Sequence, residues 1–312
     1  METPLCDFGH VATTAELRRA GFTAKHLAAL RRHPLTVQPR RGLYACGDLN
    51  STERTAVRCG GRIDCVSLLR SLGVWVGDAA PALHLRFPTS GGRTSQRRSE
   101  IRRTVVAHWR PLRRPGGKLY VPVADALRQA MDCLPPDDLI AAIESAVHLG
   151  HLSREAALEL MATAPARKRR FLREVDTGFR AQSGLETKVR LRFTRLGYRV
   201  EPQAAIPGVG HVDNLIEGVV ALETNGRDHE GSRSTDYYRD LGTEAWGIRV
   251  ISADPALLDQ HWDMIQHVVE KAIADERLLR ELRGRDLDGA PKKTPRRSRL
   301  WNESLPHGTG RR

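Results

Sequence analysis

The order of apolar and polar residues predicts two short helices and a hairpin near the start of the chain. Thr13-Thr14-Ala15-Glu16 has the form of a capping box and predicts the beginning of the first helix. Thr23 and Pro34 frame the second helix, AKHLAALRRH. The run LTVQPRRGLYACG that follows predicts two short strands around Arg40-Arg41-Gly42.

Helix, turn, helix and basic hairpin is the outline of a winged helix, which we expect over residues 1–50. In that fold the second helix enters the major groove of DNA and the hairpin touches the backbone. The alternative is a small helical protein-interaction domain whose charges are solvated. The side chains expected to contact DNA are Lys25, Arg31, Arg32, Arg40 and Arg41.

The pattern over residues 51–165 predicts an α/β middle region. A helix from Cys65 to Leu72 precedes two alternating segments, ALHLRFP and RTVVAHWR, and three further helices follow within VADALRQAMDCL, PPDDLIAAIESAVHLG and SREAALELMATA. From Arg86 to Lys118 the chain carries ten basic residues against one acid, Glu100. We expect either a basic sheet edge that faces phosphates or a solvated face.

The last part of the chain predicts a compact domain over residues 184–283, between a basic connector at 166–183 and a disordered basic tail at 284–312. An amphipathic helix from Leu185 to Leu196 precedes a strand that starts at Tyr198. HVDNLI and VVALETN read as strands joined by a tight turn, and a strand WGIRVIS and one long helix close the domain.

Composition and charge narrow the class of partner. The chain has 312 residues, 40% of them hydrophobic, which favours two or three folded domains. A formal net charge of +13 favours a polyanionic partner, with nucleic acid ahead of an anionic membrane surface. The chain has no apolar run of membrane-spanning length and no signal peptide pattern, so we expect a soluble, cytoplasmic protein without a membrane partner.

The cysteines argue against a structural zinc site at this stage. The chain has five, an odd number, and lacks both a C-x-x-C pair and histidines at zinc-finger spacing. We therefore expect reduced thiols.

The turn at Glu217-Gly218 fixes the most informative geometry. A turn there places Asp213 opposite Glu223 or its neighbour, and Glu223 and Asn225 point to one face because they are two apart on a strand. Two carboxylates and an amide oxygen suit Mg²⁺ or Mn²⁺, and Glu186 on the preceding helix is within reach. The alternative is a set of exposed acids near a hairpin.

Several motifs carry a family resemblance: S-G-L-E at residues 183–186, V-D at 212–213, E-T-N-G-R-D-H at 223–229, R-S-T-D-Y-Y-R-D at 233–240 and W-G-I-R-V at 246–250. Residues 184–275 thereby resemble the DUF559 family of very-short-patch-repair (Vsr-like) endonuclease domains of the PD-(D/E)xK superfamily. Residues 1 to about 165 are similar, more loosely, to the winged-helix region of AbiEi-type antitoxins of type IV toxin–antitoxin systems.

The resemblance implies an α+β multidomain protein that ends in a restriction-endonuclease-like α/β/α domain. It implies that Asp213 and Glu223 bind a metal ion, that Glu186 supports the site or orients water, and that His229 contacts the scissile phosphate or transfers a proton. Arg233, Asp236 and Arg239 would orient the site or grip phosphate. Asn225 stands where the family often has Asp and many related enzymes have Lys.

Two functions are open from the sequence. The first is a Mg²⁺-dependent endonuclease that hydrolyses phosphodiester bonds in DNA. The second is a DNA-binding regulator of the antitoxin type that keeps a nuclease fold with weak or no turnover, with a toxin or repair partner left unidentified.

Overall fold

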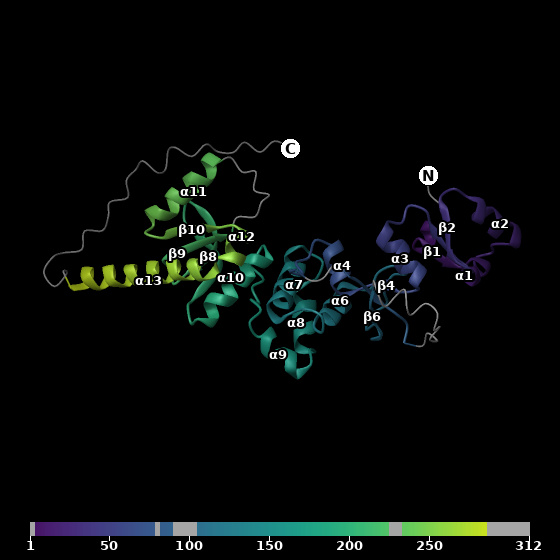
Figure 1. Ribbon diagram of the computed structural model, residues 1–312, viewed down its shortest axis with the longest axis horizontal. Coiled ribbons are helices and arrows are strands. Elements are labelled where there is room, and N and C mark those ends of the chain that lie inside the picture. Colours follow the sequence, from purple (N-terminus) through teal and green to yellow (C-terminus); the bar gives the residue numbers. More distant parts are fainter. Residues whose placement is uncertain (1–3, 79–81, 90–104, 225–232, 286–312) are drawn as a thin grey trace.

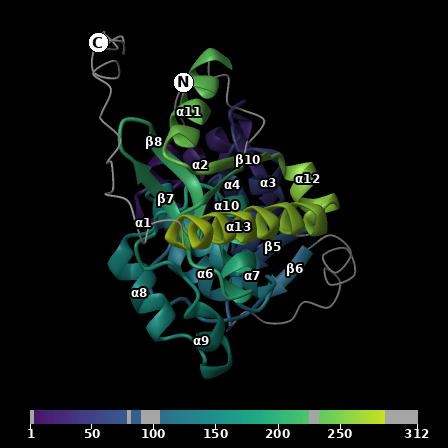
Figure 2. The ribbon, with the colours of Figure 1, turned by 90° about the vertical axis from the view of Figure 1, so that its left-hand side faces the viewer.

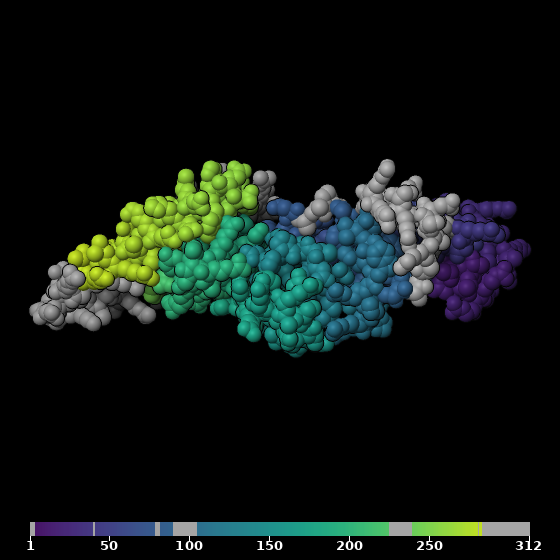
Figure 3. All heavy atoms as spheres, turned by 60° about the horizontal axis from the view of Figure 1, so that its bottom comes forward, coloured from purple at the N-terminus to yellow at the C-terminus, as the bar shows by residue number. Residues whose placement is uncertain are grey.

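The computed structural model describes residues 4–78, 82–89, 105–224 and 233–285, and it shows a mixed α/β protein. Three small sheets in this part of the chain follow one another along the long axis of the molecule, with the N-terminal sheet at one end and the C-terminal sheet at the other (Figure 1). The surface in Figure 3 runs in the same order, from purple N-terminal residues to yellow C-terminal ones. Within the same residues, every helix is too short or too polar to cross a bilayer.

The N-terminal region contains the predicted two helices and hairpin. Its elements are η1 (Cys6–Phe8), β1 (Val11–Thr13), α1 (Thr14–Arg19), α2 (Ala24–Arg32), β2 (Thr36–Arg40) and β3 (Leu43–Cys46), and the sheet order is β1-β3-β2. Thr13 and Thr23 cap the two helices, because each hydroxyl accepts a hydrogen bond from the amide three residues on. Leu17, Leu27 and Tyr44 form part of the buried core beneath them.

The middle region matches the predicted order of elements. It contains α3 (Ser51–Cys59), β4 (Arg62–Ile63), α4 (Cys65–Ser71), β5 (Leu83–Arg86), β6 (Val105–His108), α6 (Val123–Ala130), α7 (Pro136–His148) and α8 (Arg154–Ala162). The sheet order is β4-β5-β6, with β5 and β6 parallel. Apolar residues of α4, α6 and α7 form one continuous core with the sheet.

The segment expected to be a basic connector differs from the prediction. It contains α9 (Ala166–Leu172), and Leu172, Val175 and Phe179 are buried in the core of the middle region. The sequence signal was misleading because the basic residues of ARKRRFLREVDTGFRAQS lie between apolar ones that a helix and turn bury.

The C-terminal region is a four-stranded sheet of order β10-β9-β8-β7 in which β9 and β10 are parallel. Its elements are α10 (Gly184–Arg195), β7 (Val200–Ile206), β8 (Gly210–Ile216), β9 (Val220–Thr224), α11 (Arg233–Ala245), β10 (Arg249–Ala253), α12 (Pro255–Gln260) and α13 (Trp262–Arg285). The α10 and α13 helices share a core with β8 and β9, and Figure 2 shows α13 crossing in front of the strands with α11 above them. The long helix expected after Asp254 is two helices, which meet at His261.

A buried ion pair joins the middle and C-terminal regions. Glu144 of α7 is 1% exposed and accepts hydrogen bonds from Arg190 Nη2 at 2.7 Å, from the Thr187 hydroxyl at 2.6 Å and from the Asp176 amide at 2.7 Å. Gly184 at the start of α10 packs so closely on Trp75 that a Cβ there would lie 2.1 Å from the indole ring. The helix that carries Glu186 is therefore docked on the middle region by charge and by shape.

Candidate functional site

The hairpin of β8 and β9 brings Asp213 and Glu223 side by side. Glu217 and Gly218 both have positive φ, at 52° and 70°, which is the backbone of a tight hairpin turn. The register pairs Asn214 with Leu222, so the next pair along the ladder is Asp213 and Glu223. Their closeness also appears in the electrostatics, because the charge of Asp213 raises the pKa of Glu223.

Gln203 of β7 links Glu186 to this pair. Its side-chain amide donates to Glu186 Oε2 at 3.0 Å and to Asp213 Oδ1 at 3.2 Å. The other oxygen of Asp213 accepts from the backbone amide of Thr224 at 2.7 Å and from the Thr224 hydroxyl at 2.9 Å. Hydrogen bonds through Gln203 thus join Glu186 to Asp213, and the charge of Asp213 acts on Glu223. We call these three residues the carboxylate cluster.

Burial and mutual repulsion make the carboxylate cluster favour protons or cations. Burial, followed by the charge of Asp213, raises the pKa of Glu223 to about 7, although Arg239 opposes the shift. Burial and the same aspartate raise the pKa of Glu186. Neutralising the Glu223 carboxylate with a proton or a cation is therefore easier than neutralising an exposed glutamate.

The carboxylate cluster is less tightly gathered than a closed metal shell. Two other sets of His, Cys, Asp and Glu ligand atoms in the described residues lie within 4.8 Å of one another, and the carboxylate trio is not one of these sets. The Gln203 amide stands between Glu186 and Asp213 and donates a hydrogen bond to each. Carboxylate oxygens are the donors that Mg²⁺ and Mn²⁺ prefer, and Mg²⁺ commonly keeps several waters and takes only one or two carboxylates. The donor type of Asp213 and Glu223, and not the spacing of the trio, therefore suits such an ion.

The structure describes only some of the other residues that were predicted to belong to this site. Asn225 and His229 lie outside the described residues, as do the side chains of Arg233 and Asp236 on α11. Arg239, which was expected to orient the site or to grip phosphate, donates to Glu223 Oε2 at 2.9 Å. Sequence reasoning missed Gln203, which belongs to no motif, and gave no role to Thr224, although it lies within E-T-N-G-R-D-H. Both act through contacts that only the fold creates.

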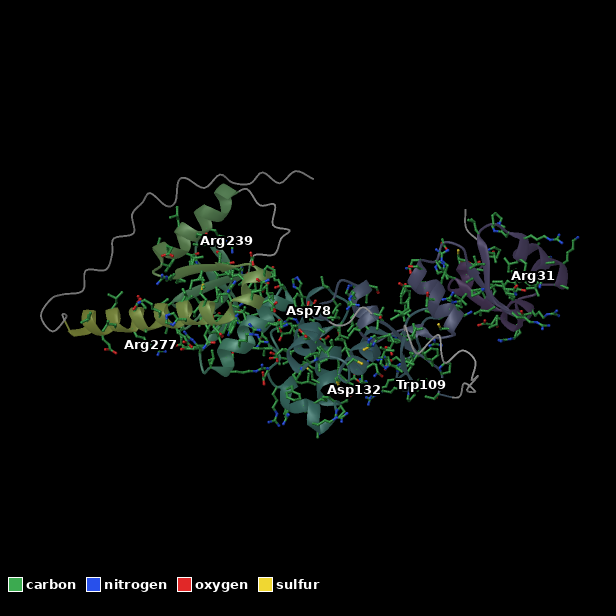
Figure 4. The ribbon with its side chains drawn as sticks, viewed as in Figure 1. Arg31, Asp78, Trp109, Asp132, Arg239 and Arg277 are labelled. Atoms are coloured by element: carbon green, nitrogen blue, oxygen red, sulfur yellow. The ribbon has the colours of Figure 1, made fainter. Side chains whose placement is uncertain are left out.

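The candidate DNA-contacting residues of the N-terminal region are at the surface. Lys25, Arg31 and Arg32 on α2 are exposed, as is Arg41 in the hairpin, whereas the side chain of Arg40 lies outside the described residues. Arg31 and Arg239 lie near opposite ends of the molecule in Figure 4. A single DNA duplex that reaches both would have to follow the length of the chain.

The basic stretch from Arg86 to Lys118 is less available to phosphates than its charge indicates. Arg86 is 4% exposed and pairs with Asp64 at 2.7 Å, so its inclusion in a phosphate-facing edge was wrong. Three other basic side chains are partnered by acids: Arg110 by Asp132, Arg114 by Glu159 and Lys118 by Glu16. The arginines between residues 90 and 104 lie outside the described residues.

Comparison with known proteins identifies no family for this chain. No family model matches it, and no curated protein is a significant match. Among solved structures the chain is similar to the RV2827C protein from Mycobacterium tuberculosis, with 18% identity over 58% of this chain and 75% of that chain, at a TM-score of 0.30. A likeness at that level carries no argument about fold or function.

Proposed function

We propose that this protein is a Mg²⁺- or Mn²⁺-dependent DNA endonuclease that hydrolyses phosphodiester bonds at the carboxylate cluster. The observation that carries the proposal is that Asp213 and Glu223 lie one step beyond the Asn214–Leu222 pair of neighbouring strands, with Glu186 joined to Asp213 through Gln203. Buried carboxylates that repel one another are costly unless a proton or cation neutralises them, which is the arrangement a metal-dependent hydrolase needs.

Each residue of the site has a separate role in this proposal. Asp213 and Glu223 would hold the ion, with the carbonyl oxygen of Asn225 as a further donor. A bound divalent ion supplies water activation and neutralises charge that develops on the phosphate. Glu186 would orient the attacking water through its place in the network, and His229 would contact the scissile phosphate or exchange a proton with it.

The N-terminal region would hold the DNA. A helix with exposed Lys25, Arg31 and Arg32, followed by a basic hairpin with Arg41, suits a winged helix on a duplex. The proposal keeps the resemblance to DUF559 Vsr-like domains for the C-terminal region and to AbiEi-type antitoxins for the N-terminal part. With a formal charge of +13, binding should weaken steeply as salt rises.

One observation favours a second function, a DNA-binding regulator that does not cut. In this structure the oxygens that would bind an ion already have partners, since Arg239 pairs with Glu223 and Thr224 donates twice to Asp213. Because the protein's own arginine and amide groups stabilise these carboxylates, the site can remain folded without a bound cation. This function predicts tight DNA binding and no metal-dependent cleavage.

Plasmid nicking separates the two functions. Purified full-length protein is incubated with supercoiled plasmid and Mg²⁺ or Mn²⁺, beside the double variant Asp213→Ala/Glu223→Ala and an EDTA control, and DNA binding is measured in parallel by mobility shift. The endonuclease proposal predicts nicking by the wild type alone. Nicking that persists in the double variant contradicts the assigned site, and wild-type binding without nicking supports the regulator.

A further inference from the structure

Four potential metal ligands meet inside the middle region, far from the carboxylate cluster in sequence. They are Cys65 at the start of α4, His84 on β5, His108 on β6 and Cys133 just after α6, and we call them the Cys/His cluster. One ligand atom from each lies within 4.8 Å of every other. Cys65 is 0% exposed, and His84 and His108 are each 7% exposed.

The folding of the middle region explains why these residues meet. The strands β5 and β6 are parallel neighbours and place both imidazoles at the same part of the sheet, with His84 Nδ1 3.1 Å from His108 Nε2. The helices α4 and α6 pack together and bring up the two thiols. Cys65 adopts a φ of +52°, a strained conformation for a residue with a Cβ, and such strain concentrates at functional positions.

The spacing fits a tetrahedral zinc ion. With Zn–N near 2.0–2.1 Å and Zn–S near 2.3 Å, a tetrahedral site separates its two nitrogens by about 3.3 Å and its two sulfurs by about 3.8 Å. The observed separation of the two imidazole nitrogens and the 4.8 Å limit on the whole set agree with that geometry. Two thiolates and two imidazoles form the ligand set of structural zinc sites, and soft sulfur donors select against Mg²⁺ and Ca²⁺.

The surroundings also suit a metal. Asp64 is fully buried beside Cys65 and interacts electrostatically with His108. Buried carboxylates next to ligating histidines commonly orient them.

From this geometry we infer that the protein binds one structural Zn²⁺ through Cys65, His84, His108 and Cys133. The ion joins two helices and two strands whose ligands are spread over residues 65–133. The cysteines form no disulfide, as expected. The inference differs from the expectation that a structural zinc site is absent, which rested on the odd cysteine count and on the absence of short C-x-x-C spacing. Zinc here stabilises the middle region, and the inference is independent of whether the C-terminal region cuts DNA.

The chain offers a matched control for a test. Cys6, His10 and Cys46 in the N-terminal region also lie within 4.8 Å of one another, and the two sulfurs are 3.9 Å apart. Cys6→Ser/Cys46→Ser therefore removes two clustered thiols without touching the Cys/His cluster. Cys65→Ser/Cys133→Ser removes the two thiols of the proposed site.

The experiment measures zinc by elemental analysis in untagged full-length protein purified under reducing conditions. We expect zinc to be retained in Cys6→Ser/Cys46→Ser and one equivalent per chain to be lost in Cys65→Ser/Cys133→Ser. Strong chelation should lower the melting temperature of the wild type by roughly 10 °C or more. Loss of zinc from Cys6→Ser/Cys46→Ser with retention in Cys65→Ser/Cys133→Ser overturns the inference. So does a reduced wild-type protein that neither contains zinc nor takes it up.

Two further readouts need no substitution, so they hold even if the cysteine variants fail to fold. Wild type reconstituted with Co²⁺ should show the visible bands of tetrahedral cobalt together with thiolate-to-metal charge transfer, and the absence of these bands counts against the site. Thiol titration of unfolded, chelator-treated protein without reductant should find all five cysteines. Finding three would mean that two of the five are paired as a disulfide, and a Cys65–Cys133 bond would contradict the zinc site.

Discussion

The two clusters of ligand atoms differ in how the chain builds them. The carboxylate cluster draws two of its members from one hairpin, where Asp213 and Glu223 are ten residues apart and face one another across a tight turn. The Cys/His cluster draws its four members from two helices and two strands spread over residues 65–133. The first is made of charged oxygen donors and the second of sulfur and nitrogen, while both are largely buried, with Glu186 and Glu223 no more exposed than His84 and His108. Ligand chemistry therefore separates a site suited to reaction from one suited to structure.

The largest effect should come from the contact that docks the C-terminal region. Glu144→Ala leaves Arg190 buried without its partner and should destabilise the protein by about 3–5 kcal/mol. Because α10 carries Glu186, the carboxylate cluster should lose its divalent-ion affinity while zinc content stays unchanged. Urea unfolding and elemental analysis check both. Equal loss of zinc and of divalent-ion affinity would mean that the two clusters are not independent.

Removing the Glu223 carboxylate should abolish the activity proposed for the carboxylate cluster and leave the Cys/His cluster unaffected. Glu223→Gln removes an ion-binding charge and should reduce Mg²⁺-dependent nicking by about 100-fold or more, with zinc content and DNA binding unchanged. Glu217→Gln is the matched control, because it makes the same change at the hairpin turn, where Glu217 pairs with the exposed side chain of Arg277 and accepts from the Arg199 backbone amide. A similar loss of nicking in both variants would mean that the substitutions act by disturbing the hairpin and not by weakening ion binding.

A shape change at the start of α10 should have a smaller effect. Gly184→Ala drives a methyl group into the Trp75 ring and should destabilise the protein by roughly 1–3 kcal/mol. Gly117→Ala is the control, because a Cβ there would meet only the Tyr120 carbonyl oxygen at 3.7 Å. Thermal unfolding of the two variants measures the difference, and equal melting temperatures would show that α10 moves away at little cost.

The smallest effect concerns Glu16, whose neighbour is the cation Lys118, whereas the neighbour of Glu223 is another carboxylate. A hydrogen bond from Lys118, and then one from the Thr13 amide, lower the pKa of Glu16 from 4.5 to about 2. The stability that Glu16 contributes is therefore present above pH 4.5 and is lost as the pH falls toward 2. Because the pair is partly exposed, we expect only about 1 kcal/mol. Glu16→Gln should be less stable than the wild type at pH 7, and the difference should shrink by pH 3.

The sequence was sufficient where the determining contacts are local. Thr13 and Thr23 cap the helices they were expected to cap, and the turn at Glu217-Gly218 sets the strand register as expected. Contacts between residues far apart in the chain could not be predicted from the sequence. Nothing in the composition marks Arg86 as a buried partner of Asp64, Gln203 as the link between two acids, or Leu172 as a core residue within a basic run. The Cys/His cluster was missed for the same reason, since its ligands become neighbours only after β5, β6, α4 and α6 pack.

Calorimetric titration tests the central claim most directly. Full-length protein is first equilibrated with zinc and desalted, so that thiols do not react with the titrant, and Mn²⁺ is then added to the wild type and to Glu223→Gln. The account predicts one binding event in the wild type that Glu223→Gln weakens by about 10-fold or more. Equal binding by both proteins, or no binding by the wild type, would contradict a divalent-ion site built on Asp213 and Glu223.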